Sequence, residues 1–245
     1  MDVIGVIPAR YGSTRFEGKA LADILGKPMI QHVYERAKKA KILDDLIIAT
    51  DDQRIIDAVK RFKGKVIYTS PNQPTGTDRL TEVVNALDVK VVVNIQGDEP
   101  LIEPTMIDHL ARAVLGNDKV TMATLIKRIE DPNQINDPNV VKVVTDRNGN
   151  ALYFSRSPIP YKRSEDKAVY YKHIGLYAYT KDFLFTYKNL PTSLLEECEK
   201  LEQLRVLENG YKIKTVETKF DTIGVDTPED LERVKECLLK TQEQA

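Results

Sequence analysis

Short runs of β-branched and aliphatic residues alternate with helical patterns through the first half of the chain, and this alternation most constrains the fold. Strands are expected over Val3–Pro8, Leu46–Ala49, Lys65–Thr69 and Val91–Ile95. The last of these is almost wholly apolar, which is typical of a strand buried on both faces. Such a βαβα order predicts an α/β fold whose mostly parallel, Rossmann-like sheet is covered by helices.

Helices between these strands are predicted from one-sided apolar spacing and from capping residues. Pro28–Ala40 carries its apolar residues on one face and begins with proline, which suits the first helical position. A second helix is expected over Asp52–Phe62, after residues able to cap it. A third helix carries Leu80 and Val83 on its apolar face. Helices in these places would connect parallel strands.

The alternation of strands and helices ends at Thr121, and from there tight turns join the strand-like segments. Strand-like segments cover 121–126, 140–145, 151–155 and 170–179. Tight turns favour antiparallel pairing, so we expect a smaller mixed or antiparallel subdomain inserted over about 121–187 in a single domain of residues 1–245. Helices return at Leu194–Glu208 and Thr227–Lys240, the second with a threonine N-cap followed by proline.

Composition excludes several classes of protein. The 245 residues include 36 Lys and Arg against 37 Asp and Glu, a formal net charge of −1, which disfavours general binding to nucleic acid or anionic membranes. No apolar run is long enough for a transmembrane helix, so no membrane insertion is expected. Cys198 and Cys237 form no CxxC pair, which favours a reduced cytoplasmic protein without disulfides or a zinc site.

A basic loop follows the first predicted strand, at the end of the sheet where open parallel sheets bind ligands. It carries Arg10, Arg15 and Lys19 beside glycines and hydroxyl residues, with little apolar content. Three cations with free backbone N–H groups suit a polyphosphate, because they offset its charge and donate hydrogen bonds. The pattern is neither Walker A nor G-x-G-x-x-G. Its place after the first strand favours a phosphate-binding loop over a solvated basic loop.

Two aspartates are candidate ligands for a hard cation. Asp98 follows the fourth predicted strand, several residues too early to cap the helix that begins near Pro104. Mg²⁺ prefers one or two carboxylates together with phosphate oxygens, so Asp98 suits a magnesium site. Asp226 directly precedes Thr227, and on its own it fits equally well as an accessory acid at the start of a helix. Pairing with Asp98 favours the metal role.

Several short motifs occur in order along nearly the whole chain. They are Ile7–Arg15, Gly18–Lys19, Gly26–Ile30, Asn94–Pro100, Ala151–Arg156 and Gly224–Leu231. Together they resemble the family of 3-deoxy-manno-octulosonate (Kdo) cytidylyltransferases, for which one motif alone would be a weak sign but the ordered set is specific. One departure is Phe16-Glu17, where the family usually has Leu-Pro. The added carboxylate would oppose the binding of phosphate.

The resemblance implies a nucleotide-diphospho-sugar transferase fold, CTP and Kdo as substrates, Mg²⁺ as cofactor, a homodimer, and a role in bacterial lipopolysaccharide synthesis. It implies that residues 121–187 supply the sugar pocket and the dimer contact of one nucleotidyltransferase domain. Lys19, Arg15 and Asp98 would be catalytic, and Asp98 and Asp226 would hold the metal. The implied nucleotide contacts are Pro8, Ala9, Arg10, Arg15, Lys19, Gly76, Thr77, Arg79 and Gln96. The implied sugar contacts are Arg79, Gln96, Arg156, His173, Glu202 and Gln203.

Several of these positions also have ordinary structural explanations. Thr77 fits a helix N-cap better than a ligand contact, and Arg79 could reach the site or be a surface charge. A lone histidine in a strand, such as His173, is more often structural than catalytic. Glu202 and Gln203 could belong to a plain helix face. The simplest role for the tyrosines is in a core or an interface: Tyr170, Tyr171, Tyr177 and Tyr179.

The expected reaction is nucleotidyl transfer, in which the anomeric hydroxyl of Kdo attacks the α-phosphate of CTP and pyrophosphate leaves. A cytidylyltransferase for another acidic sugar, such as sialic acid or an 8-amino analogue of Kdo, is the nearest alternative. The loop Arg10–Arg15 and the run Phe154–Arg156 favour Kdo over sialic acid and leave the amino analogue open. A non-catalytic nucleotide-binding protein on the same fold is a further alternative. The presence of both acids and all three loop cations argues against it.

Overall fold

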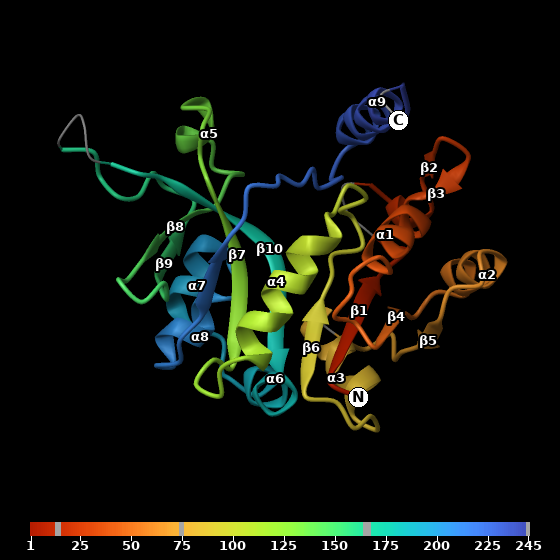
Figure 1. Cartoon of the computed structure of the whole chain (residues 1–245), viewed down its shortest axis with the longest axis horizontal. Helices are drawn as coiled ribbons and strands as arrows, with labels where there is room; N and C mark the ends of the chain where they lie inside the picture. The colour runs from red at the N-terminus through yellow and green to blue at the C-terminus, as the bar shows by residue number, and fades with distance from the viewer. Residues whose placement is uncertain (13–15, 74–75, 164–167, 244–245) are drawn as a thin grey trace. The chain divides into compact units, whose positions relative to one another are not determined.

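The computed structural model describes residues 1–12, 16–73, 76–163 and 168–243, and its contacts divide the chain into two compact units (Figure 1). The first unit comprises Met1–Asp108 together with Thr222–Ala245, and the second comprises His109–Asp221. The second unit contains the segment 121–187, for which the sequence predicted an inserted subdomain. Helix α4 (Pro104–Leu115) runs from the first unit into the second.

Four parallel strands form the sheet of the first unit, in the order β6 (Val91–Asn94), β1 (Val3–Ala9), β4 (Asp45–Thr50) and β5 (Val66–Tyr68). Strands β1 and β6 are almost entirely buried, as their apolar sequences predicted. The pairing is parallel, so β1, β4 and β6 all end at the same edge of the sheet. The predicted α/β class and parallel sheet are confirmed.

Helices of this unit pack against that sheet: α1 (Met29–Ala37), α2 (Gln53–Arg61) and α3 (Gly76–Val84). Helix α1 begins one residue later than predicted, because Pro28 is its extended N-cap residue, and it ends three residues earlier. A short turn of 3₁₀-helix η1 (Lys19–Leu21) and a hairpin of β2 (Asp23–Ile24) with β3 (Lys27–Pro28) precede it.

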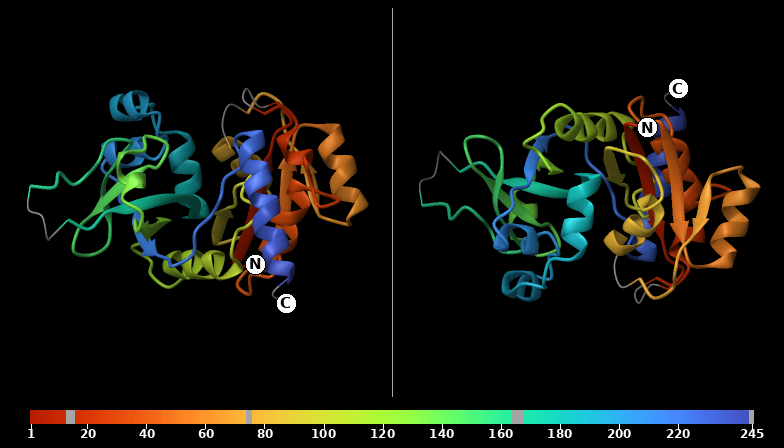
Figure 2. Two further views of the ribbon diagram at one scale, coloured as in Figure 1. Left: turned by 90° about the horizontal axis from the view of Figure 1, so that it is seen from above. Right: turned by 90° about the horizontal axis from the view of Figure 1, so that it is seen from below.

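The C-terminal helix α9 (Pro228–Glu243) belongs to the first unit and packs beside its N-terminal elements (Figure 2). Its apolar side chains Leu231 and Val234 join a buried cluster with Ile24, Met29 and Val225. Burial of such side chains contributes about 1.5–3 kcal/mol each. This packing brings the segment before α9 back to the N-terminal unit.

In the second unit the strands are mixed in direction and centred on β7 (Met122–Arg128). Strand β10 (Tyr171–Thr180) pairs with β7 in antiparallel fashion, and β11 (Lys214–Glu217) pairs with it in parallel. The remaining strands β8 (Lys142–Thr145) and β9 (Ala151–Ser155) pair in antiparallel fashion with each other, and β8 also pairs with β10. The helices here are α5 (Asn133–Asn136), α6 (Lys181–Lys188), α7 (Leu194–Glu199) and α8 (Leu204–Glu208).

The helix predicted over Leu194–Glu208 is wrong as a single helix, because α7 and α8 are separate. Lys200 ends α7 in the left-handed region with φ 54°, so the chain leaves the helical path there. Helix α8 then starts after Gln203 and ends before Gly210, whose φ is 80°. Among the described residues no helix is long and apolar enough to cross a membrane.

Candidate active site

Lys19 lies at the edge of the sheet, after the loop that follows β1. The backbone N–H of Gly18 donates to the carbonyl of Tyr11 at 2.8 Å, which closes the loop between them. Gly18 has φ 68°, a conformation that glycine adopts without strain, and η1 begins at the next residue. Arg15, predicted to contact phosphate, lies outside the described residues.

The ammonium group of Lys19 lies between the two predicted metal ligands. Its Nζ atom is 2.6 Å from Oδ2 of Asp98 and 3.2 Å from Oδ1 of Asp226. It also donates to the carbonyl of Val225 at 3.2 Å. The side chain of Lys19 is mostly buried, whereas that of Asp226 is 46% exposed. Three residues from distant parts of the sequence therefore meet at one point.

Backbone geometry explains why the two aspartates meet. Asp98 follows β6, and its carbonyl accepts a hydrogen bond from the N–H of Val225 at 2.9 Å, which ties the two segments together. The N-terminus of α9 is capped as predicted: Thr227 Oγ1 accepts from the N–H of Asp230, whose Oδ2 accepts from the N–H of Thr227. The cap is thus made by Thr227 and Asp230, and the Asp226 carboxylate is placed against Lys19.

The charges of this cluster favour the protonated lysine. Burial lowers the pKa of Lys19, but the neighbouring carboxylates of Asp98 and Asp226 outweigh it and raise the pKa above its usual value of 10.5. Two carboxylates that share one cation in this way form a donor set of hard oxygens. No group of three or more His, Cys, Asp or Glu side chains suited to a metal occurs in the described part of the chain. A metal held by Asp98 and Asp226 would therefore need further oxygens, from water or from a bound ligand.

A small cavity of about 70 Å³ adjoins this cluster. Six of the predicted site residues line it: Pro8, Ala9, Arg10, Lys19, Gln96 and Asp98. A pocket for a whole drug-sized ligand typically holds roughly 300 Å³ or more, so this cavity suits one phosphate-sized part of a larger ligand. The guanidinium of Arg10 donates to the carbonyl of Gln73 at 2.8 Å, which fixes its direction.

Glycine allows the backbone segments around this cavity to approach one another. A Cβ on Gly97 would lie 2.9 Å from the carbonyl oxygen of Pro8, a contact that side chains do not tolerate. A Cβ on Gly76 would lie 3.6 Å from Cγ of Pro8, so the start of α3 is also adjacent. The structure thus brings Gly76, another predicted nucleotide contact, to the same edge of the sheet.

Arg79 and Thr77 are placed differently from the simplest sequence expectations. Arg79 is fully buried, so the surface-charge explanation is wrong. Its guanidinium pairs with Asp51 at 2.9 Å and donates to the hydroxyl of Thr69, while its Nε has no partner among the described residues. Helix α3 begins at Gly76, so Thr77 lies inside the first turn and the N-cap assignment is wrong. Arg79 joins the segments that follow β4 and β5.

In the second unit, His173 lies on β10 within a row of aromatic rings. Its ring is 5.1 Å from Phe154 and 5.4 Å from Tyr177, between centroids. Burial lowers the pKa of His173 to about 3, so the imidazole is neutral at pH 7. Nε2 of His173 lies 3.0 Å from the hydroxyl oxygen of Thr124, within hydrogen-bond distance.

Glu202 and Gln203 occupy the break between α7 and α8, so they do not form part of a continuous helix face. The side-chain amide nitrogen of Gln203 is buried and has no hydrogen-bond partner among the described residues. Burial raises the pKa of Tyr177, and the charge of Glu202 raises it further, which places Glu202 near the aromatic row. Sequence reasoning assigned Tyr177 to a core or interface. No sequence pattern indicated that Tyr177 interacts with both His173 and Glu202.

Arg156 is held by a network that sequence reasoning also missed. The carboxylate of Glu199 accepts from the N–H of Arg156 at 2.9 Å and from the hydroxyl of Ser155 at 2.5 Å. The Arg156 guanidinium donates to the carbonyls of Glu199 at 2.8 Å and Pro138 at 2.9 Å. Lys142, fully buried, donates to the carbonyl of Arg156 at 2.6 Å. These hydrogen bonds determine the position of Arg156.

Comparison with known proteins places the chain among cytidylyltransferases. The family model described as "Cytidylyltransferase" matches residues 4–213. A 3-deoxy-manno-octulosonate cytidylyltransferase from Geobacter metallireducens is 53% identical, covering 99% of this chain and all of the relative. Another, from Solibacter usitatus, is 56% identical over 95% of this chain and 92% of the relative.

A solved structure is similar over the same extent. It is a CMP:2-keto-3-deoxy-manno-octonic acid synthetase complexed with CTP, 45% identical, with a TM-score of 0.94. The similarity covers 98% of this chain and all of that one. The predicted nucleotide-diphospho-sugar transferase fold agrees with this match.

Proposed function

Because the chain belongs to the 3-deoxy-manno-octulosonate cytidylyltransferase family, we propose that it transfers the cytidylyl group of CTP to Kdo. The anomeric oxygen of Kdo forms a bond to the α-phosphorus, and the bond from that phosphorus to the β-phosphate oxygen breaks. Pyrophosphate leaves with the bonding electrons, the sugar proton passes to solvent, and CMP-Kdo forms. CMP-Kdo is an activated sugar, and lipopolysaccharide synthesis is the pathway in which we place it.

The observation that carries this proposal is the cluster of Lys19, Asp98 and Asp226 at the carboxyl edge of a parallel sheet. Nucleotidyl transfer needs little covalent chemistry from the protein, so catalysis depends on positioning and on neutralising phosphate charge. Lys19 supplies a cation that keeps its proton at pH 7, and Arg10 lines the same cavity. We propose that both bind the triphosphate, together with Arg15.

We propose Mg²⁺ as the cofactor, held by Asp98 and Asp226. The fit rests on the donor set: two carboxylates close enough to share one cation, here the ammonium of Lys19. When bound there, Mg²⁺ would neutralise charge on the α-phosphate and favour ionisation of the sugar hydroxyl. The residues of the chain orient the substrate, and Lys19 offsets the charge of the phosphates that leave.

Asp98→Asn tests this metal site, because an amide is a poor magnesium ligand. We expect turnover to be nearly abolished while thermal melting stays close to that of the wild type. Asp118→Asn removes one charge from an exposed position and serves as the matched control, with expected wild-type turnover. Turnover of Asp98→Asn within a few-fold of wild type at limiting Mg²⁺ would rule out this ligand assignment.

For the sugar we propose a pocket in the second unit that includes Arg156, His173, Glu202 and Gln203. The buried amide nitrogen of Gln203, which has no partner within the described part of the chain, supports this role, since a buried donor without a partner is costly unless a ligand completes it. The neutral ring of His173 offers an acceptor nitrogen to a sugar hydroxyl.

We further propose a homodimer that works in the cytoplasm. Large apolar side chains exposed on the second unit support the dimer, because apolar surface of this kind is often covered by a partner. They include Leu152 at 61%, Tyr161 at 88% and Leu194 at 71% exposure. Cys198 and Cys237 remain free thiols, which suits a reducing compartment.

Release of pyrophosphate from CTP tests the reaction and its sugar specificity together. The protein is mixed with CTP, Mg²⁺ and one of several acids: Kdo, its 8-amino analogue or sialic acid. We expect rapid release with Kdo and slow release without a sugar acid. Faster release with the amino analogue would change the assigned substrate, and no release with any of them would favour a nucleotide-binding protein without catalysis.

A further inference from the structure

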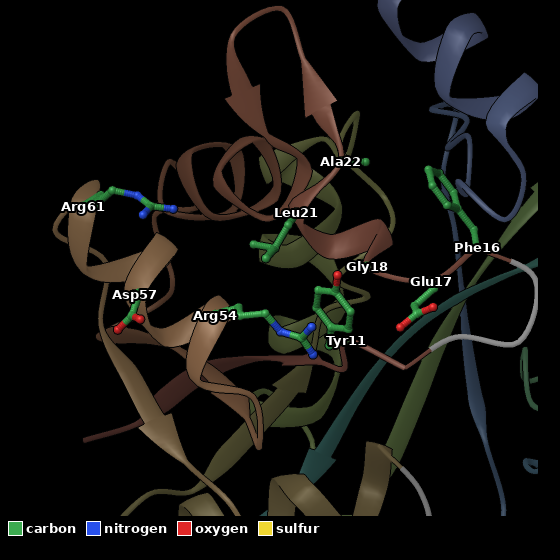
Figure 3. A pocket seen from close by; sticks show the side chains of 9 residues that line it. All are labelled: Tyr11, Phe16, Glu17, Gly18, Leu21, Ala22, Arg54, Asp57 and Arg61. Atoms are coloured by element: carbon green, nitrogen blue, oxygen red, sulfur yellow. The ribbon is translucent and has the colours of Figure 1, made fainter.

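Arg54, at the start of α2, lies against the first aromatic residue of the basic loop. Its guanidinium carbon is 3.2 Å from the centroid of the Tyr11 ring. Tyr11, Arg54 and Glu17 line the same open cavity of about 500 Å³, in which the guanidinium and the ring are neighbours (Figure 3). An arginine over an aromatic face is attracted by the negative potential of the ring. The contact joins the loop after β1 to the helix after β4.

The guanidinium is held over the ring by a carboxylate. Asp52 accepts from Nε of Arg54 at 2.9 Å and from its terminal nitrogen at 2.6 Å, the paired geometry that fits arginine to a carboxylate. Asp52 is also the N-cap of α2, since its Oδ1 accepts from the N–H of Arg54 at 2.9 Å. In addition, Ala9 and Thr50 are register partners at the ends of β1 and β4. The position of the Arg54 guanidinium over the Tyr11 ring is therefore supported by helix α2 and by the ends of β1 and β4.

Tyr11 in turn determines how the basic loop closes. Its carbonyl accepts the hydrogen bond from Gly18, and a Cβ on Gly18 would lie 3.0 Å from Cζ of the Tyr11 ring. The ring thus packs directly on the residue that precedes Lys19. Movement of the ring would shift Gly18 and the start of η1, and with them the ammonium that Asp98 and Asp226 hold.

The carboxylate of Glu17 is a second group on which Arg54 acts. This carboxylate lies in the loop that is proposed to bind triphosphate, where it would repel the ligand. The paired carboxylate of Asp52 raises the pKa of Arg54 above its usual value, and the charge of Glu17 adds to this rise. Glu17 and Arg54 line the same cavity, so the guanidinium offsets part of the charge of Glu17.

We propose that Arg54 is a positioning residue for the triphosphate loop, acting through Tyr11 on the loop closure at Gly18 and compensating the charge of Glu17. Arg54 acts without contacting the nucleotide. This inference rests on the proposed function, since it concerns the affinity of that same site for CTP.

The test compares binding of CTP and CMP, by titration calorimetry, in the full chain and its variants. For Arg54→Gln we expect CTP to bind roughly three- to tenfold more weakly, the range of a lost cation–π contact, and CMP to bind as in the wild type. Arg54→Lys keeps a cation but loses the paired geometry, so an intermediate loss is expected. Arg61→Gln, which removes another arginine of α2 from the same cavity, is the matched control with unchanged affinities.

A second pair of variants separates the two tasks of Arg54. Asp52→Asn keeps a capping oxygen on α2 but weakens the hold on the guanidinium, so it should lose affinity for CTP in the same direction. Glu17→Gln, added to Arg54→Gln, should restore part of the lost affinity. If the double variant binds CTP no better than Arg54→Gln, compensation of Glu17 is wrong.

Equal losses for CTP and CMP, or wild-type CTP affinity in both Arg54→Gln and Asp52→Asn, would overturn the positioning role. These outcomes differ from failure of the proposed function itself. In that case the wild-type chain would neither bind CTP nor release pyrophosphate with Kdo, whereas failure of the positioning role leaves both wild-type activities intact.

Discussion

Replacing Asp226 by asparagine separates function from helix capping at one position. The carboxylate of Asp226 lies 3.2 Å from Nζ of Lys19, while Thr227 and Asp230 make the cap of α9. The change keeps the size of the side chain and removes its charge. We therefore expect a large loss of activity with a small loss of stability.

The expected losses of stability and of turnover can both be estimated. With 46% of the Asp226 side chain exposed, its ion pair is screened by water and should contribute less than ~1 kcal/mol to the free energy of unfolding. For a chain of this size that is a fall in Tm of less than about 4 °C. Loss of groups that only support a metal ligand already costs about 10- to 100-fold, so loss of a ligand should lower turnover by roughly 100-fold or more.

The assay measures thermal melting and pyrophosphate release on the same preparations, with and without Mg²⁺ and CTP. Asp230→Ala is the matched control, because it removes a capping carboxylate one turn away. This control should lose about 0.5–2 kcal/mol of stability and keep most of its turnover. If Asp226→Asn instead melts several degrees lower with turnover preserved, Asp226 is a structural acid and the metal role falls to Asp98 alone.

Three further outcomes are expected. Lys19→Ala should weaken CTP about tenfold or more, as loss of a charged hydrogen bond does, with a much smaller effect on CMP; equal losses would place Lys19 away from the outer phosphates. Glu199→Gln should raise KM for Kdo roughly three- to tenfold and leave KM for CTP unchanged, because Glu199 orders Arg156; a change in both would indicate general damage. Burial raises the pKa of Asp221, but pairing with Lys172 and Lys127 leaves it below 3.8, so its stabilisation is complete above pH 3.8 and lost as pH falls further. Asp221→Asn should therefore be less stable than wild type at pH 7, by under ~1 kcal/mol, and the difference should shrink towards pH 3 in urea unfolding; a constant difference would contradict this.

The first unit was the more predictable from sequence, because strands that are buried on both faces have almost wholly apolar sequences. Strands β1, β4 and β6 are close to their expected bounds, and their parallel order follows from the helices between them. The meeting of Asp98 and Lys19 also follows, since both come after strands that end at one edge. Cap chemistry located the start of α9 in the same way.

In the second unit, sequence patterns failed to predict two features of the fold. The run Leu194–Glu208 looks like one helix because its composition favours helix throughout, and nothing in the type of Lys200 marks a left-handed residue. Strand β11 was missed because a short strand at Lys214–Glu217 depends on pairing with β7, a contact distant in sequence. Tertiary pairing therefore decided the case of β11.

Buried charges were the hardest site residues to predict. Lysine and arginine usually lie on the surface of a protein, yet Lys142 and Arg79 are fully buried. Hydrogen-bond partners offset the cost of this burial: backbone carbonyls for Lys142, and Asp51 with Thr69 for the terminal guanidinium nitrogens of Arg79. Such partners are assembled by the fold and leave no local pattern.

Phosphorus NMR of the reaction products shows whether this chain joins CMP to Kdo. With CTP, Kdo and Mg²⁺, we expect one new sugar phosphodiester of CMP for each pyrophosphate released, and a higher kcat/KM for Kdo than for its 8-amino analogue or sialic acid. Hydrolysis of CTP to free CMP without a sugar conjugate, or a higher kcat/KM for another sugar acid, would contradict this expectation.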